Sequence, residues 1–268
     1  MSMLFGNMTG TAYSDYMSRD ASPTSAADIA IELRAAISSG DYRPGDRLPG
    51  ENPLMETYGV ARMTARRALA MLRDEGLTMT RRGVGVFVRQ LRPVVRNSTS
   101  RLSPTQWRAG KMTWEADHNA RNLTVDHIEV TPSEAPDEET RSVLDLDENE
   151  TVTVRHRRYS LDGKPVMVAT SYVPARIAQG TRITETDTGP GGIYRCLDEL
   201  GYAPAHFRED ITSRMPSPSE SQVLEIAPGT PVHEIVRTAG TKDGTPVEVN
   251  RMILDAAAFV LRYDFDAP

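Results

Sequence analysis

The chain has 268 residues, of which 39% are hydrophobic and 25% charged, a composition typical of a globular protein with room for two domains. No apolar run approaches the roughly 18–20 residues of a membrane-spanning helix, so we expect no membrane segment. Cys196 is the only cysteine, which excludes an intrachain disulfide and a metal site built on several thiolates and fits a cytoplasmic location.

The N-terminal residues 1–24 lack the basic and apolar segments of a signal peptide, and we expect a mobile tail there. Charge is spread unevenly along the rest of the chain, whose net charge is -6. Between Arg62 and Arg92 eight arginines stand against two acidic residues, whereas residues 132–150 hold eight acidic residues and one arginine. A local basic patch on an acidic chain indicates a dedicated nucleic-acid-binding module, with a merely solvated charged face as the alternative.

Three helices are expected between residues 28 and 75. The stretch DIAIELRAAISSG carries apolar residues at helical spacing and ends at Gly40. ENPLMETYG is a short second helix, in which Pro53 is tolerated because it falls in the first turn. Gly59 then permits a sharp turn into a third helix from about Arg62 to Glu75.

The third helix has an apolar face and a separate basic face. The apolar stripe that should pack on the other two helices consists of Ala65, Ala68, Leu69 and Leu72. Arg62 and Arg66 lie one turn apart on a different face, with Met63 and Arg67 beside them. Cations at a helix N-terminus oppose the helix dipole, so folding stability does not explain them, whereas an anionic partner does. This arrangement predicts a recognition helix in the DNA major groove.

A β-hairpin is expected directly after this helix. LTMT and GVFV form its two strands around RRGVG, and Arg81 and Arg82 lie at the tip. A wing of this kind reaches phosphates or the minor groove while the helix reads base edges. A plain helical hairpin followed by a solvated ribbon is the alternative.

The combined pattern LPGENPLMETYGVARMTARRALAMLRDEGLTMTRRGVGVFV resembles the winged helix-turn-helix of the GntR family of bacterial transcription regulators. By this resemblance Arg62, Thr64 and Arg66 contact the operator from the recognition helix, and Arg82 with Gly83 does so from the wing. The family usually has an arginine where this chain has Asn52, which offers only a neutral hydrogen bond. It often has a serine cap where this chain has Ala61, a change that costs about 1 kcal/mol of helix capping. The resemblance implies a DNA-binding domain over residues 25–92.

Residues 93–122 are rich in Pro, Ser and Asn and show little periodicity, so we expect a linker that packs partly against the next domain. It holds both tryptophans. Trp107 and Trp114 are expected to serve as buried packing, with the wall of a ligand pocket as the alternative.

The second domain, residues 123–268, contains an internal repeat. Residues 142–175 parallel residues 222–256: each copy has Val-Leu, an acidic residue, a loop, an alternating strand, Asp-Gly-x-Pro-Val and a second alternating strand. Arg157 aligns with Arg237. Asp-Gly between alternating runs predicts a hairpin, and two copies of helix plus hairpin predict an antiparallel sheet with helices on one side, hence an α+β fold.

This half resembles the effector-binding domain of the HutC subfamily of GntR regulators, the UTRA domain, which shares its fold with chorismate lyase. The most specific stretches are RHRRYSLDGKPVMVATSYVPA and RTAGTKDGTPVEVNRMILDA. The resemblance implies a cleft where the two repeats meet, with a small metabolite bound in it, often a phosphorylated sugar or a carboxylate.

The resemblance also indicates which residues bind the effector. They are the anion-binding arginine of the strand, its neighbour two positions on, the Ser-Tyr pair and the acidic residue of the second repeat: Arg157, Tyr159, Ser171, Tyr172 and Glu248. Ala169 stands where the family often has a glutamate that holds a sugar hydroxyl, which favours a less polar effector.

Two further features are candidates for the same cleft. Gly189, Gly191 and Gly192 precede an expected helix whose free N–H groups form an anion site, or else they form a simple turn. Arg208 either lines the cleft or forms a surface ion pair with Glu209 or Asp210.

The sequence bears on three classes of function: an enzyme, a ligand-controlled regulator and a ligand-independent regulator. Catalysis is disfavoured because the five histidines are scattered without metal-ligand spacing and Cys196 has no partner motif, so we expect no catalytic residue, metal or cofactor. The favoured reading is a homodimeric transcriptional repressor on a pseudo-palindromic DNA operator, controlled by a small anionic or polar effector. The alternative is a ligand-independent dimeric repressor, of plasmid or phage type, whose second domain only dimerises.

Overall fold

The computed structural model describes residues 25–89, 93–97, 99–111, 123–226 and 228–265, and its contacts divide the chain into two compact units. The first spans Met1–Gln90 and the second Leu91–Pro268. Each unit is described by itself. In the described part of the chain no helix is long and apolar enough to span a membrane.

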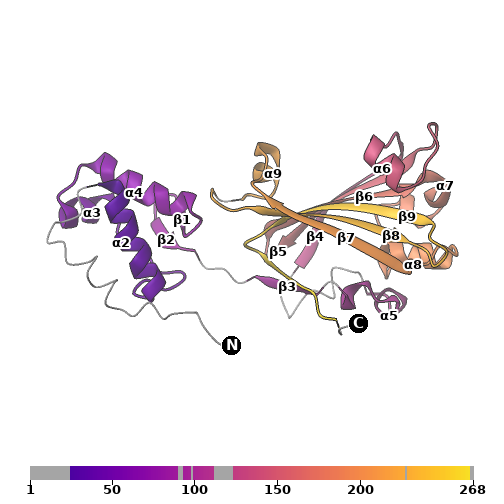
Figure 1. Ribbon diagram of the computed structural model, residues 1–268, viewed down its shortest axis with the longest axis horizontal. Helices are drawn as coiled ribbons and strands as arrows, with labels where there is room; N and C mark the ends of the chain where they lie inside the picture. Colours follow the sequence, from indigo (N-terminus) through magenta and orange to yellow (C-terminus); the bar gives the residue numbers. More distant parts are fainter. Residues whose placement is uncertain (1–24, 90–92, 98, 112–122, 227, 266–268) are drawn as a thin grey trace, which may run out of the picture. The chain divides into compact units, whose positions relative to one another are not determined.

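The first unit contains three helices followed by a two-stranded hairpin (Figure 1). These elements are α2 (Ala26–Ser39), α3 (Glu51–Tyr58), α4 (Arg62–Asp74), β1 (Thr78–Arg81) and β2 (Gly85–Val88). Ser25 and Asp28 form a capping box at the start of α2, and Gly40 ends that helix in the left-handed conformation. All five elements occur where the sequence predicts them.

A single apolar core holds the three helices and the hairpin together. Its fully or nearly buried members are Ile29, Ala30, Leu33, Leu48, Leu54, Ala65, Ala68, Leu69, Leu72 and Val88. The predicted stripe of α4 therefore faces inward in full, which leaves the other face of that helix to solvent.

The second unit is built on a six-stranded antiparallel sheet in the order β4-β5-β6-β9-β8-β7 (Figure 1). Its strands are β4 (Leu123–Glu134), β5 (Val152–Leu161), β6 (Lys164–Pro174), β7 (His206–Arg214), β8 (Val232–Gly240) and β9 (Pro246–Asp255). The predicted α+β class is confirmed, since helices pack on a sheet that is antiparallel throughout.

The internal repeat appears as two matching halves of the sheet. Each half has three strands, and a short helix precedes its second strand: α6 (Glu138–Val143) in one half and α9 (Pro218–Val223) in the other. The residue two places after each helix adopts the same left-handed backbone, with φ of 51° at Asp145 and 49° at Glu225. Strands β6 and β9 pair at the centre, where the two halves meet.

Helices cover both faces of this sheet, and the prediction of helices on one side only was wrong. The two repeated helices lie over the same face, above the sheet in Figure 1, and α8 (Gly192–Glu199) and α5 (Pro104–Arg108) lie below it. The lower cluster contains Trp107, Tyr194 and Leu197, all buried. These extra helices come from segments outside the repeat, so the repeat pattern does not reveal them.

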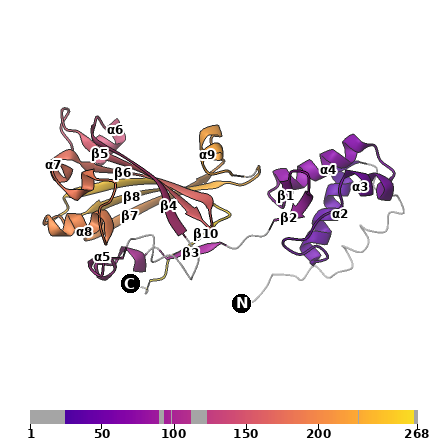
Figure 2. The same ribbon diagram turned by 180° about the vertical axis from the view of Figure 1, so that it is seen from behind.

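A second, two-stranded sheet joins distant parts of this unit. Strand β3 (Val94–Asn97) pairs in parallel with β10 (Phe259–Arg262), close to the end of the described chain (Figure 2). The segment predicted as a linker thus supplies β3, η1 (Ser100–Leu102) and α5 to the second unit. Trp107 is buried against Tyr194 and Phe207, in agreement with its predicted packing role, and Trp114 lies outside the described residues.

Candidate functional site

The start of α4 presents its predicted residues to solvent. Met63 has 69% of its surface exposed, Arg66 and Arg67 are exposed, and Thr64 is half-buried. Ala61 makes no side-chain cap, in keeping with the prediction. The exposed Met63 side chain adds no buried apolar area to the core. Its position among exposed arginines therefore indicates that this face binds a partner.

Helices α3 and α4 meet at their N-termini through polar contacts. Arg62 donates from Nη2 to Asn52 Oδ1 at 3.1 Å, and its Nε lies 3.6 Å from Glu51 Oε2. Asn52 and Arg62 are therefore adjacent on one surface. Asn52 orients the guanidinium of Arg62 and adds no charge of its own.

The wing carries two arginines with different surroundings. Arg81 stacks over the Phe87 ring, with Cζ 4.6 Å from its centroid, so its position is fixed. Arg82 and Gly83 form the exposed tip, where Gly83 has φ of 75°.

Arg47, which the sequence analysis did not single out, lies against the base of the wing. A Cβ on Gly85 would come within 2.7 Å of Arg47 Nε, so a larger residue there would displace the Arg47 guanidinium from this position. The Arg47 backbone also forms a β-bridge with Phe87.

The arginines of this unit include some that form ion pairs with a carboxylate and some that form none within residues 25–89. Arg34 and Arg73 form ion pairs with Glu75 and Asp74. By contrast, a set of exposed arginines has neither a hydrogen-bond nor an ion-pair partner within residues 25–89: Arg47, Arg66, Arg67 and Arg82. Unpaired cations gathered on the start of α4 and on the wing indicate an anionic polymer as partner.

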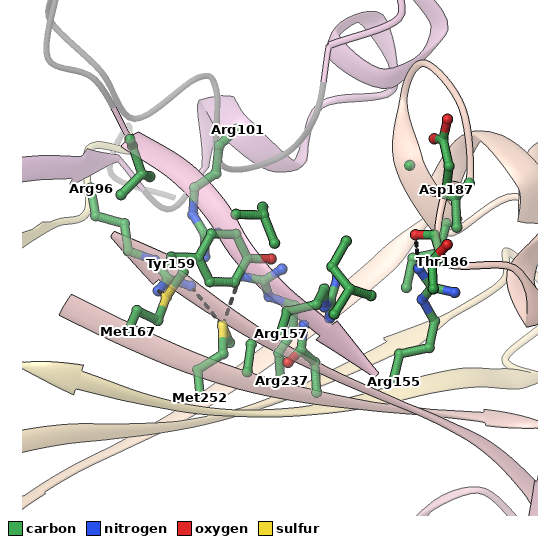
Figure 3. A pocket seen from close by; sticks show the side chains of 18 of the residues that line it. Arg96, Arg101, Arg155, Arg157, Tyr159, Met167, Thr186, Asp187, Arg237 and Met252 are labelled. Atoms are coloured by element: carbon green, nitrogen blue, oxygen red, sulfur yellow. Dashed lines mark hydrogen bonds between the residues drawn. The ribbon is translucent and has the colours of Figure 1, made fainter. Parts of the chain in front are cut away.

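The second unit contains a cavity of about 350 Å³ over the face of the sheet on which α8 lies (Figure 3). Five arginines line it, together with eight apolar side chains and five other polar residues: Tyr159, Thr186, Asp187, Thr188 and Asn250. The arginines are Arg96, Arg101, Arg155, Arg157 and Arg237. They come from β3, η1, β5 and β8, so the cavity lies where the two halves of the repeat meet, as predicted.

Two of the five arginines lack a carboxylate partner among the described residues. Arg155 donates only to backbone carbonyls: Ile183 O at 2.7 Å, Thr186 O at 3.1 Å, and Glu185 O. Arg157 donates to the Ser171 hydroxyl.

The electrostatics of this pair follow from burial. Burial, and then the adjacent charge of Arg157, lowers the pKa of Arg155 to about 10, despite the attraction of the buried Glu248. Arg155 nevertheless stays charged at neutral pH, so two neighbouring cations face the cavity. An anion bound there would relieve their repulsion.

The other three arginines share one buried carboxylate. Arg101 lies 2.6 Å, Arg237 2.7 Å and Arg96 3.6 Å from Oε1 of Glu209, and Tyr263 donates to Oε2 at 3.0 Å. Burial by itself would raise the pKa of Glu209, but the three guanidinium charges outweigh it and hold the pKa at about 2. Glu209 is thus a shared acceptor for all three guanidinium groups.

Three of the predicted effector-binding residues line the cavity: Arg157, Tyr159 and Gly192. Ser171 lies beneath Arg157 as its hydrogen-bond acceptor, and Glu248 is fully buried on the same face of the sheet without lining the cavity. Ala169, which stands where the family often has a sugar-binding glutamate, also lines the cavity.

Two other predicted effector residues do not line this cavity, because alternation along a strand turns their side chains away from it. Tyr172 faces the α6 side of the sheet, where it packs near Leu144 and stacks 5.6 Å from Arg251. Arg208 is exposed and pairs with Asp210 at 3.1 Å, the surface ion pair considered as an alternative.

The glycine turn before α8 also differs from the anion site considered. The N–H groups of Gly191 and Gly192 donate to Gly110 O and Gly189 O, so neither is free for a ligand. A Cβ on Gly191 would lie 2.4 Å from the carbonyl oxygen of Trp107. Gly191 is therefore a packing residue that lets α5 approach α8, and its assignment as an effector contact was wrong.

Four cavity arginines were missed by the sequence analysis. Arg155 lies two residues before Arg157 on the same strand and therefore faces the same side of the sheet. Arg237 occupies the position of Arg157 in the second repeat. Both could therefore have been predicted from the sequence. Arg96 and Arg101 lie in the segment taken for a linker, where no periodicity marks which side chains turn inward.

Comparison with known proteins matches both parts of the chain. Residues 25–88 match bacterial regulatory proteins of the gntR family, and residues 119–259 match the UTRA domain. An uncharacterised HTH-type transcriptional regulator of Streptomyces coelicolor is 34% identical over 254 residues, which cover 90% of this chain and 92% of that protein. The HTH-type transcriptional repressor NagR of Bacillus subtilis is 24% identical over 226 residues, 82% of this chain and 86% of NagR. A crystal structure of a GntR-family transcriptional regulator superposes with a TM-score of 0.63 at 23% identity, covering 91% of this chain and 98% of that one.

Proposed function

The chain belongs to the GntR family of bacterial regulatory proteins and carries a UTRA domain, and we propose from this that it is a repressor whose operator affinity is controlled by a small anionic metabolite. Membership confirms the predictions of a DNA-binding transcriptional regulator and of a protein that is not an enzyme. The observation that carries the proposed control is the pair Arg155 and Arg157, two arginines that line the cavity and have no carboxylate as a hydrogen-bond or ion-pair partner among the described residues.

The first unit binds the operator with the exposed face at the start of α4 and with the wing. Arg62, Thr64 and Arg66 read base edges from the start of α4, and Met63 and Arg67 lie beside them on the same exposed surface.

The wing and the loop before α3 hold the DNA backbone. Arg81, Arg82 and Gly83 contact phosphates or the minor groove. Arg47 supplies a further phosphate contact next to them and thereby replaces part of the positive charge that Asn52 lacks.

Two substitutions separate base reading from backbone binding. Arg66→Ala should cost about 1–3 kcal/mol of operator binding and relax the preference for the operator over unrelated DNA. Arg82→Ala should weaken binding to both DNAs alike and reduce the salt slope. Fluorescence anisotropy at several salt concentrations measures both quantities, with Arg73→Ala, which removes an arginine already paired with Asp74, as the matched control. Equal, unselective losses from Arg66→Ala and Arg82→Ala would contradict this division.

Two copies of the chain act together in this proposal. A homodimer presents two reading heads related by a two-fold axis, and such a pair binds a pseudo-palindromic operator. The regulator works in the cytoplasm, where its operator DNA lies.

Control requires that the effector bind one arrangement of the dimer more tightly than the other, because a ligand with equal affinity for both shifts nothing. The test is anisotropy of the purified protein on the DNA upstream of its own gene, repeated with fractions of a metabolite extract. Release of the operator by one fraction supports the switch. Tight, salt-sensitive binding that no fraction alters would favour the ligand-independent dimeric repressor instead.

A further inference from the structure

Met63 is the most exposed large apolar side chain among the described residues of the first unit. Its surface is 69% exposed, against 53% for Val84 and 49% for Ile31. Two other methionines of this unit, Met55 and Met71, pack against its core, whereas Met63 does not belong to that core. Burial of apolar area on folding therefore does not account for the position of the Met63 side chain.

This side chain lies among cations at the start of α4. Met63 is the second residue of the helix, and helical spacing places Arg66 and Arg67 one turn further along on the same face. Both arginines are exposed and have neither a hydrogen-bond nor an ion-pair partner within residues 25–89. When these positive charges hold a DNA duplex, Met63 is brought against the base pairs, because the N-terminal part of such a helix enters the major groove.

The chemistry of the thioether restricts what Met63 can contact in that groove. A thioether has no hydrogen to donate and is a weak acceptor, so it cannot read the donor and acceptor pattern of a base edge. The apolar group that the bases present in the major groove is the 5-methyl group of thymine. The flexible, polarizable side chain of methionine adapts to such a small target. The minor groove presents no methyl group, so the exposed Val84 of the wing has no equivalent target there.

We infer that Met63 contacts the 5-methyl group of one thymine in each operator half-site and thereby makes thymine preferred over cytosine at that position. Removing a methyl group from water is worth about fourfold in affinity. The arginines supply the charge that holds the duplex, and Met63 supplies a preference that a hydrogen-bond donor cannot provide. The inference rests on the proposed function and adds a base preference to the reading face of α4.

The test begins with selection of the operator by the full chain from a pool of random-sequence DNA duplexes. Each thymine of the selected operator is then replaced, one at a time, by deoxyuridine, which lacks the 5-methyl group and keeps every hydrogen-bonding group of the base. Fluorescence anisotropy should show about fourfold weaker binding at one thymine of each half-site, and about 15-fold weaker binding when both are replaced. At that position 5-methylcytosine should be bound more tightly than cytosine, because it carries the methyl group in the same place.

Variants of the protein assign the methyl contact to one residue. Met63→Ala should bind the thymine and deoxyuridine duplexes equally, and Met63→Leu, which keeps a large apolar side chain, should keep part of the difference. Ile31→Ala is the matched control, because it also removes an exposed apolar side chain from the first unit but does so on α2. This control should keep the full difference. The melting temperature of each variant shows whether it is folded.

Three results would overturn the inference: an operator whose half-sites contain no thymine, no weakening of wild-type binding by any deoxyuridine, or an equal deoxyuridine effect in the wild-type protein and Met63→Ala. The last result would assign the methyl contact to another residue. Failure of the proposed function gives a different outcome. If the selection enriches no sequence, base reading by α4 fails together with the inference. If an operator is enriched and its binding depends on Arg66 but not on any thymine methyl group, only the inference fails.

Discussion

Replacing Glu209 by glutamine should lower the free energy of unfolding of the second unit by about 3–5 kcal/mol, the usual cost of removing one partner of a buried ion pair. Glu209 is 6% exposed and is shared by Arg96, Arg101 and Arg237, so the variant leaves three guanidinium groups without their common carboxylate. Urea denaturation followed by circular dichroism measures the loss.

The matched control is Glu199→Gln. Glu199 also contacts two arginines, Arg182 and Arg195, but its side chain is 44% exposed, so its removal should lower the free energy of unfolding far less than the removal of Glu209 does. Comparable losses in the free energy of unfolding of the two variants would show that burial of the carboxylate does not determine the size of the loss.

The same carboxylate predicts a pH dependence. The folded pKa of Glu209, about 2, lies below its usual 4.5, so its charge stabilises the fold above pH 4.5 and that stabilisation is lost as the pH falls toward 2. The stability gap between the wild-type protein and Glu209→Gln should therefore be widest at neutral pH and shrink at pH 3. An equal gap at both pH values would show that the carboxylate is protonated in the folded protein or plays no electrostatic role.

Leu72→Ala should unfold the first unit selectively. Leu72 is fully buried where α4 meets the other helices, and truncation of a buried leucine costs about 2–5 kcal/mol. That is a large fraction of the stability expected for a domain of this size. Hydrogen exchange followed by mass spectrometry should show peptides from residues 26–88 losing protection while peptides from the six-stranded sheet keep theirs. Operator binding should fall in parallel.

Met63→Ala is the control on the same helix. With 69% of its surface exposed, Met63 should change stability by no more than about 0.5 kcal/mol. Simultaneous loss of protection in both sets of peptides of Leu72→Ala would mean that the two units unfold as one.

The first unit was predictable in nearly every element because its information is local. Helical spacing, the glycines at positions 40 and 59 and the RRG turn each determine structure within a few residues. What the sequence did not reveal there is the position of Arg47, since its contact with Gly85 depends on how a loop folds back onto a hairpin 38 residues further along the chain.

The cavity was predictable only in part. Strand alternation and the repeat place Arg157 and Tyr159 correctly, and the same rules applied more strictly would have excluded Tyr172 and Arg208. The position of Arg101 could not be predicted from the sequence. Arg101 enters the cavity because β3 pairs with the distant β10, and no local pattern marks this pairing.

That parallel pairing has a genetic consequence. Strand β10 is the hydrogen-bonded partner of β3, and Phe259 within it is a cavity wall. A premature stop codon at position 259 would therefore spare the entire reading head and the six-stranded sheet while opening the cavity and releasing Arg96. If the proposed switch operates, such an allele would be dominant and uninducible, a phenotype otherwise expected from missense changes in the arginines themselves.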